Sequence, residues 1–292
     1  MLPVLLIFLT GFIFQRVFML DIRPLSTMAM YLLLPFLVFQ TFYKQPLDAS
    51  FLYIVVTSLL ILAGLILIGW LLSKWRHYPK KQVNGFLLAT VFPNSGNYGV
   101  PIVLFAYGQK GLAYAMPLMV FHTILMGVVG IYIAANGDSA GGFKKPLQSV
   151  LKQPMNYVII PGILMQHYHV TIPANFMKSI DLVSNIAIPL IMLILGMQLA
   201  NVVGQHINWR RVGLASIVRL VISPILAYGI CLLFPIDPLL RNVIVVMAAM
   251  PSAANTTLYA IEFEAEPQFV SSATLVTTLA SIFSLTFVLN LL

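Results

Sequence analysis

The sequence predicts an all-α integral membrane protein, and two properties of the chain lead to that prediction. Hydrophobic residues make up 60% of the 292 residues and charged residues only 8%, with a mean hydropathy of +0.96. A soluble domain carries about 25% charged residues, so this chain cannot cover a globule with a charged surface and has to face lipid. The apolar residues also gather in segments of about 20, the length that a helix needs to cross a bilayer.

Ten such segments are expected to span the membrane, with short loops between them. A polar stretch rich in Gly, Ser and Lys, residues 136–152, follows the fifth segment and is expected to be a linker. The expected spans are 2–20, 24–43, 50–73, 83–107, 111–135, 155–169, 179–200, 210–234, 240–262 and 267–291.

The basic residues of the short loops predict the orientation of the chain in the cell (inner or plasma) membrane. Placing both termini outside puts eleven Lys and Arg residues on the cytoplasmic side and four on the outer side, which is the expected bias. The central linker is then cytoplasmic. The cytoplasmic set is Arg16, Arg23, Lys74, Arg76, Lys80, Lys81, Lys144, Lys145, Lys152, Arg210 and Arg211, and the outer set is Lys44, Lys110, Lys178 and Arg241.

Two matching stretches indicate that the second half of the sequence repeats the first. When "VFPNSGNYGVPIV" is placed over "AMPSAANTTLYAI", Pro93 aligns with Pro251 and Asn97 with Asn255. Both pairs have the same offset of 158 residues (251 − 93 and 255 − 97). The chain is therefore expected to contain two copies of one unit.

These copies, residues 1–135 and 153–292, each contain five of the expected spans. Because five is odd, the second copy must lie upside down relative to the first. An inverted-topology repeat of this kind is typical of secondary transporters.

The two matching stretches also interrupt the fourth and ninth spans. Proline removes a backbone donor, and the hydrocarbon core cannot satisfy the freed backbone groups. The breaks are therefore expected to lie inside the protein, where half-helix N-termini can attract an anion. The expected break residues are Pro93, Gly96, Gly99, Pro101 and Pro251. The side chains expected to bind a substrate there are Asn94, Ser95, Asn97, Ser252, Asn255 and Thr256.

Four further polar residues lie within expected spans, and each has two interpretations. Arg219 could be a substrate countercharge or could snorkel to an interface. His122 could carry a coupling proton or be a hydrogen-bonded packing residue. Gln40 and Gln198 could reach the site or hold helices together.

Other classes of function are not expected. The sequence contains no GxxxxGK[ST] motif for ATP, no HExxH and no GxSxG, so no enzymatic activity is expected. Its single cysteine excludes a thiolate metal site, and neither a metal nor a cofactor is expected. The scattered basic residues form no nucleic-acid-binding patch.

A family resemblance rests on the same stretches. "LATVFPNSGNYGVPIVLFAYGQKGLAYA" resembles the fourth span and following loop of the auxin efflux carrier family, and "MAAMPSAANTTLYA" resembles its ninth span. The resemblance implies that spans four and nine cross, that spans 1, 2, 6 and 7 form a scaffold, and that spans 3–5 and 8–10 form a moving transport domain. It also implies a homodimer. The matching residues are Pro93, Asn94, Asn97, Gly99, Pro251 and Asn255.

The resulting hypothesis is a secondary active or potential-driven transporter that moves small organic acid anions by alternating access. The substrates implied by the family are acids such as malate, malonate or auxin-like carboxylates. One alternative is a symporter that couples the anion to Na⁺ or H⁺. Another is a membrane receptor on the same scaffold that does not transport.

Overall fold

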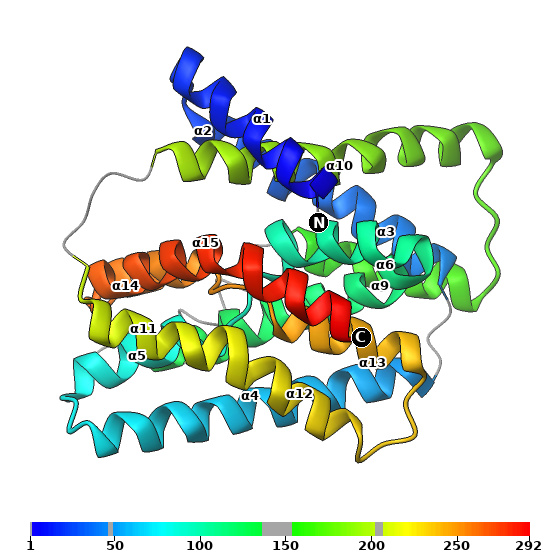
Figure 1. The fold of residues 1–292 in the computed structure, drawn as a ribbon. Helices are drawn as coiled ribbons and strands as arrows, with labels where there is room; N and C mark the ends of the chain where they lie inside the picture. The colour runs from blue at the N-terminus through cyan, green and yellow to red at the C-terminus, as the bar shows by residue number, and fades with distance from the viewer. Residues whose placement is uncertain (1, 46–48, 136–153, 202–206) are drawn as a thin grey trace.

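The computed structural model describes residues 2–45, 49–135, 154–201 and 207–292, and the expected linker 136–152 lies outside these ranges. The described residues are helical apart from their connections and one isolated antiparallel bridge between Pro93 and Ser252 (Figure 1). The all-α prediction is therefore confirmed for the part of the chain that the structure describes.

The elements follow the expected spans closely, and short π-helical turns (η) interrupt several of the helices. In chain order they are α1 (Leu2–Phe18), α2 (Ile22–Met28), η1 (Ala29–Leu33), α3 (Leu34–Lys44), α4 (Ala49–Trp75), α5 (Lys80–Val91), η2 (Ser95–Gly99), α6 (Val100–Leu125), η3 (Met126–Gly130), α7 (Ile131–Ala135), α9 (Met155–His167), α10 (Ala174–Ala200), α11 (Trp209–Ile217), η4 (Val218–Ile222), α12 (Ser223–Cys231), α13 (Pro238–Ala248), α14 (Asn255–Glu262) and α15 (Pro267–Leu291).

Within the described residues, six helical stretches are long and apolar enough to cross a membrane. They establish a multi-pass membrane protein. Shorter apolar helices cover Pro3–Phe18 and Pro238–Ala248. The six long stretches are Ile22–Lys44, Ser50–Trp75, Ser95–Ala135, Ala174–Ala200, Trp209–Cys231 and Pro267–Leu291.

One helix boundary differs from the expected ones, and one expected break falls at a kink inside α6. Helix α10 begins at Ala174 rather than near 179, because its first turns are polar and a hydropathy pattern does not register them. The expected break between the spans 83–107 and 111–135 coincides with a kink inside α6 at Gly108, whose φ of 63° is left-handed. Glycine has no Cβ and adopts that backbone conformation at little cost.

The helices form two packing groups. In the first group α1 packs along α10, and α3 packs on both α9 and α10. In the second group α4 packs on α5, α6 and α12, α13 packs on α6 and α12, and α15 packs on α5, α11 and α14. The groups meet where η2 and α6 contact α10. Figure 1 shows α1 and α10 on one side of the molecule and α4, α5, α11 and α12 on the other.

A pair of glycines allows the backbones of α1 and α10 to approach closely. A Cβ placed on Gly196 would lie 2.1 Å from the carbonyl oxygen of Phe8, and one on Gly11 would lie 2.2 Å from that of Leu193. Small residues of this kind allow membrane helices to pack at short distances. The close contact between α1 and α10 in the first group therefore depends on these two glycines.

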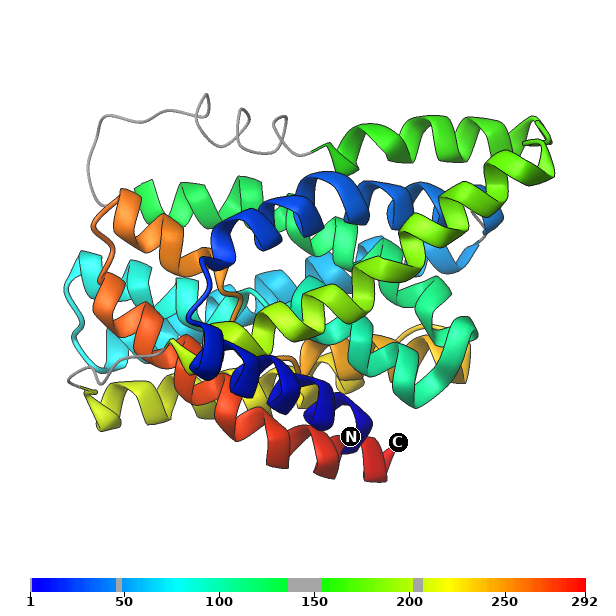
Figure 2. The same ribbon diagram turned by 90° about the horizontal axis from the view of Figure 1, so that it is seen from above.

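Connections at two opposite ends join the helices (Figures 1 and 2). Residues 19–21, 76–79 and 263–266 lie at one end, and residues 168–173 and 232–237 lie at the other. The N-terminus of α1 and the C-terminus of α15 are both directed toward this second end.

Candidate functional site

The helices stop at both proline-containing stretches. Helix α5 ends at Val91 and η2 begins at Ser95, while α13 ends at Ala248 and α14 begins at Asn255. The residues between these ends are extended or turn-like rather than helical. Each break therefore leaves one C-terminal and one N-terminal helix end inside the protein.

The two breaks pair with each other through their backbones. Pro93 and Ser252 form the antiparallel bridge. The Asn94 N–H donates to the carbonyl oxygen of Pro251 (2.8 Å), and the Ala253 N–H donates to that of Phe92 (2.9 Å). The backbone groups that the prolines release are thus satisfied by the other break and not by lipid.

The carbonyl ends of α5 and α13 converge on one arginine. Arg219, which is 0% exposed, donates through Nη1 to the carbonyl oxygens of Thr90 (3.0 Å) and Val91 (2.9 Å). Through Nη2 it donates to the carbonyl oxygen of Ala248 and to the Ser223 hydroxyl, and Ser223 itself donates to Ala248 (2.7 Å). These bonds satisfy carbonyl groups that have no partner within their own helices.

The N-terminal ends of η2 and α14 border a cavity of about 50 Å³, hereafter the crossing cavity. Among the described residues, no hydrogen bond involves the side-chain amides of Asn94, Asn97 or Asn255. The oxygen and nitrogen atoms of these amides are also not fully buried, since none of them is among the buried polar atoms without a partner. The crossing cavity is lined by Met30, Leu34, Pro93, Asn94, Ser95, Gly96, Asn97, Met119, His122, Thr123, Met126, Met155, Ala253, Ala254 and Asn255.

His122, in the wall of the crossing cavity, is in hydrogen-bond contact with two serines. Its Nδ1 lies 2.7 Å from the Ser95 hydroxyl, and its Nε2 lies 3.4 Å from the Ser58 hydroxyl of α4. A proton on one ring nitrogen leaves the other as an acceptor, so His122 can accept from one serine and donate to the other. The histidine therefore links the first break to α4.

Two of the residues expected to bind substrate have roles within the fold. The buried Ser252 donates its hydroxyl to the carbonyl oxygen of Ala89, near the end of α5. The buried Thr256 donates to the carbonyl oxygen of Ala253 (2.7 Å), one turn earlier in its own chain. Neither residue lines the crossing cavity.

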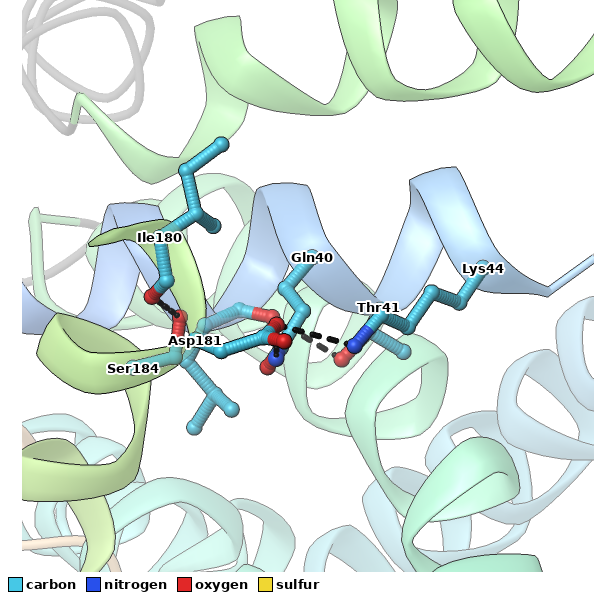
Figure 3. Close-up of polar contacts among 7 residues, drawn as sticks. Gln40, Thr41, Lys44, Ile180, Asp181 and Ser184 are labelled. Carbon is cyan, nitrogen blue, oxygen red and sulfur yellow. Dashed lines mark hydrogen bonds and ion pairs between the residues drawn. The ribbon is translucent and has the colours of Figure 1, made fainter. Parts of the chain in front are cut away.

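The two glutamines also lie away from the crossing cavity. Gln40 donates to the Asp181 carboxylate, which forms an ion pair with Lys44 at 2.9 Å (Figure 3). This cluster lines a separate cavity of about 580 Å³ between α3, α6 and α10. Gln198 is partly buried in the last turn of α10 and borders neither cavity.

The remaining break residues shape the chain around the crossing cavity. Pro93 and Gly96 line it, Pro251 accepts the Asn94 bond, and Pro101 lies in the first turn of α6. A Cβ on Gly99 would lie 2.7 Å from the Met247 sulfur, so a glycine there lets η2 pack against α13.

Residues 1–289 match the family described as membrane transport protein. The chain belongs to this family. The match confirms the resemblance to the auxin efflux carriers, and it shows that the chain is a transporter rather than an enzyme.

Three curated relatives of this membrane transport protein cover nearly its full length. An uncharacterized transporter of Methanocaldococcus jannaschii is 28% identical over 295 residues, which is 96% of this chain and 93% of the relative. An uncharacterized transporter of Methanothermobacter thermautotrophicus is 26% identical over 290 residues, 97% of this chain and 94% of the relative. A Rhizobium meliloti protein, provisionally named a malonate transporter, is 25% identical over 281 residues, 92% of this chain and 86% of the relative.

Sequence reasoning missed part of the cavity wall of this membrane transport protein. Leu34 and Met155 come from the first packing group, and so does Met30, whose turn η1 packs on α3 and α10. Met119 and Thr123 come from the second group, and so does Met126, whose turn η3 packs on α6. The methionines carry no signal in the sequence, because apolar residues fill every span. Thr123 directly follows His122, and adjacent residues of a helix do not face each other, so the sequence gives no signal for it either.

Proposed function

We propose that this chain transports small organic acid anions by alternating access and that the crossing cavity binds the carboxylate. The observation that carries the proposal is a set of three asparagines, Asn94, Asn97 and Asn255, which the two paired breaks bring to one cavity. Their amides have no hydrogen-bond partner in the part of the chain that the structure describes. Amide N–H groups and helix N-termini attract an anion, and no full positive charge has to be exposed in the bilayer.

The size of the crossing cavity favours a compact acid. A water molecule needs about 10–15 Å³ of cavity volume, so a cavity of about 50 Å³ has room for roughly four waters. The flexible side chains of Met119 and Met126 can adjust to an acid of somewhat larger volume. The name of the Rhizobium meliloti relative agrees with a dicarboxylate of this size.

The two packing groups support a moving-domain mechanism. The first contains α1, α3, α9 and α10 and would be the scaffold, and the second contains both breaks and would be the transport domain. The cavity of about 580 Å³ between α3, α6 and α10 lies where the groups face each other, and we propose it as the entry path. The inverted five-span repeats, both termini outside, a cytoplasmic linker and a homodimer belong to the same proposal.

The driving force decides the direction of transport. The membrane potential acts on an uncompensated anion with about 2.3 kcal/mol per charge per 100 mV and drives it outward from a negative cytoplasm. Uptake would need a coupled proton, a cation or exchange. Of these, a proton is favoured by the position of His122, which is bonded to Ser95 in the cavity wall.

Thermal unfolding of the purified protein with a panel of monocarboxylates, dicarboxylates and indole acids tests the site. A ligand that binds only the folded state raises its apparent stability. We expect a compact carboxylate to raise the Tm of the wild type. We expect that rise to disappear in Asn97→Ala and in Asn255→Ala, because each variant removes the amide of a residue that lines the cavity.

The matched control is Asn175→Ala, which removes an exposed asparagine in the first turn of α10. This variant should keep the full ligand-induced rise. If neutral or cationic compounds stabilise the wild type and no carboxylate does, the anion site is wrong. If Asn175→Ala loses the rise together with the other two variants, the crossing cavity is not where the acid binds.

A further inference from the structure

Arg219 is a buried cation. Outside its own span, all of its hydrogen-bond acceptors are backbone carbonyl oxygens. It belongs to η4 and is among the largest side chains that are fully buried. Its partners outside its own span are the carbonyl oxygens of Thr90, Val91 and Ala248. Among the described residues it forms no ion pair with a carboxylate, since the ion pairs there involve Lys44, Lys81 and Arg211.

The charge of Arg219 is matched by two helix ends. Each helix C-terminus carries a partial charge of about −0.5, so the ends of α5 and α13 together carry about −1. Both ends belong to the first halves of the broken spans. One guanidinium therefore balances the field that the two breaks create within the membrane.

Carbonyl groups at broken-helix C-termini are the ligands that commonly hold a coupling cation such as Na⁺ in secondary transporters. Here the guanidinium is already in hydrogen-bond contact with these carbonyl groups. The free space beside it is a void of about 20 Å³, bordered by Ser58, Pro93 and His122 as well as Arg219. That volume suits about one water. A dehydrated Na⁺ would need the carbonyl oxygens of Thr90, Val91 and Ala248 as ligands, and the guanidinium already bonds to them.

We infer that Arg219 is a tethered cation that takes the place of a coupling Na⁺ at the crossing of the two broken spans. It positions both breaks and does not itself bind the substrate, because it does not line the crossing cavity. For transport, which rests on the proposed function, the consequence is that anion binding and flux do not require Na⁺.

Chemical rescue tests the tethered cation by thermal unfolding of the purified protein in Na⁺-free buffer. Arg219→Ala should lower the Tm, because the buried carbonyl oxygens of Thr90 and Val91 lose their donor and that of Ala248 keeps only the Ser223 hydroxyl. Guanidinium at millimolar concentrations, far below those that denature, should raise the Tm of this variant by several degrees, since it can occupy the vacated space. Guanidinium should leave the Tm of the wild type unchanged.

The matched control is Arg241→Ala. It removes a partly buried arginine at the start of α13 that stacks on Tyr228 of α12. Its Tm should not respond to guanidinium. Absence of rescue in Arg219→Ala, or equal rescue in Arg241→Ala, would overturn the inference. If Arg219→Ala cannot be purified, Arg219→Lys replaces it, and this variant should fold and keep a Tm that does not depend on Na⁺. A Tm of Arg219→Lys that rises specifically with Na⁺ would contradict the inference.

The transport half of the inference has a separate readout. The acid-induced rise in the wild-type Tm should be the same in Na⁺ and in N-methylglucamine buffers, and a rise that appears only with Na⁺ would contradict the inference. If no acid shifts the wild type in either buffer, the proposed function fails, while the guanidinium experiment still decides whether Arg219 is a tethered cation.

Discussion

Saturable transport of the preferred acid should fall by about 100-fold or more when Asn97 and Asn255 are both replaced by alanine. A hydrogen bond to a charged group contributes about 1.5–3 kcal/mol, and each 1.4 kcal/mol is a factor of ten in affinity. Neither amide has a hydrogen-bond partner among the described residues, and the two asparagines line the crossing cavity from different breaks. Uptake of the radiolabelled acid into proteoliposomes, compared at concentrations well below saturation, measures the loss.

Asn175→Ala again serves as the control for this flux measurement, and it should transport at the wild-type rate. Folding of the double variant is checked separately by its unfolding temperature without ligand. Transport by a folded double variant at more than half the wild-type rate would show that the carboxylate is held elsewhere. Binding of the acid without flux in the wild type would favour the receptor over the transporter.

Gly196→Leu should strongly destabilise the protein, because its side chain would enter the contact between α1 and α10. The first atom of that side chain would already lie 2.1 Å from the Phe8 carbonyl oxygen and 2.9 Å from its carbon. A flexible side chain can move away, whereas a helix backbone moves only when the whole helix shifts. Overpacking costs about 1–3 kcal/mol when side chains relax, and we expect about 3 kcal/mol or more here.

The measurement is thermal unfolding in detergent, with Gly213→Leu as the control. Gly213 lies in α11, and a Cβ placed there would have no heavy atom within 4 Å. Leucine also has a higher helix propensity than glycine. Gly213→Leu should therefore unfold at or above the wild-type temperature. Equal unfolding temperatures for the two variants would show that α1 and α10 do not pack as described.

Much of the fold could be predicted from the sequence because the bilayer imposes a length and a composition on each span. The polar starts of helices escaped this reasoning: α10 begins with Asn175 and Lys178 in its first turns, and only an apolar run reveals a span. The breaks at Pro93 and Pro251 were also visible, since proline and glycine act on the backbone locally.

The roles of polar residues in the breaks could not be predicted in the same way. Ser252 and Thr256 look as suitable for a ligand as Ser95 does, yet they bond to the carbonyl oxygens of Ala89 and Ala253. Backbone acceptors are invisible in a sequence, because every residue has one. The partners of Arg219 were hidden for the same reason.

The geometry of the crossing cavity also depends on contacts between distant segments. Met30 and Met155 reach it from the first packing group. Gln40 has a polar side chain in a span but is paired with Asp181 and lies against another cavity. Which polar residue of a span reaches the site is decided by the rotation of its helix, and hydropathy does not determine that rotation.

The central claim is that the anion occupies the crossing cavity, and protection of an introduced cysteine tests it most directly. Ala254→Cys places a thiol in the cavity wall at a small, partly exposed residue that contributes no side-chain hydrogen bond. The native Cys231 is buried, and Asn175→Cys supplies an exposed control on α10. The rate of maleimide labelling is measured with and without the acid that stabilises the wild type, after confirming that it also stabilises Ala254→Cys. We expect the acid to slow labelling of Ala254→Cys several-fold and to leave Asn175→Cys unchanged. An unchanged rate at Ala254→Cys under saturating acid would contradict the account.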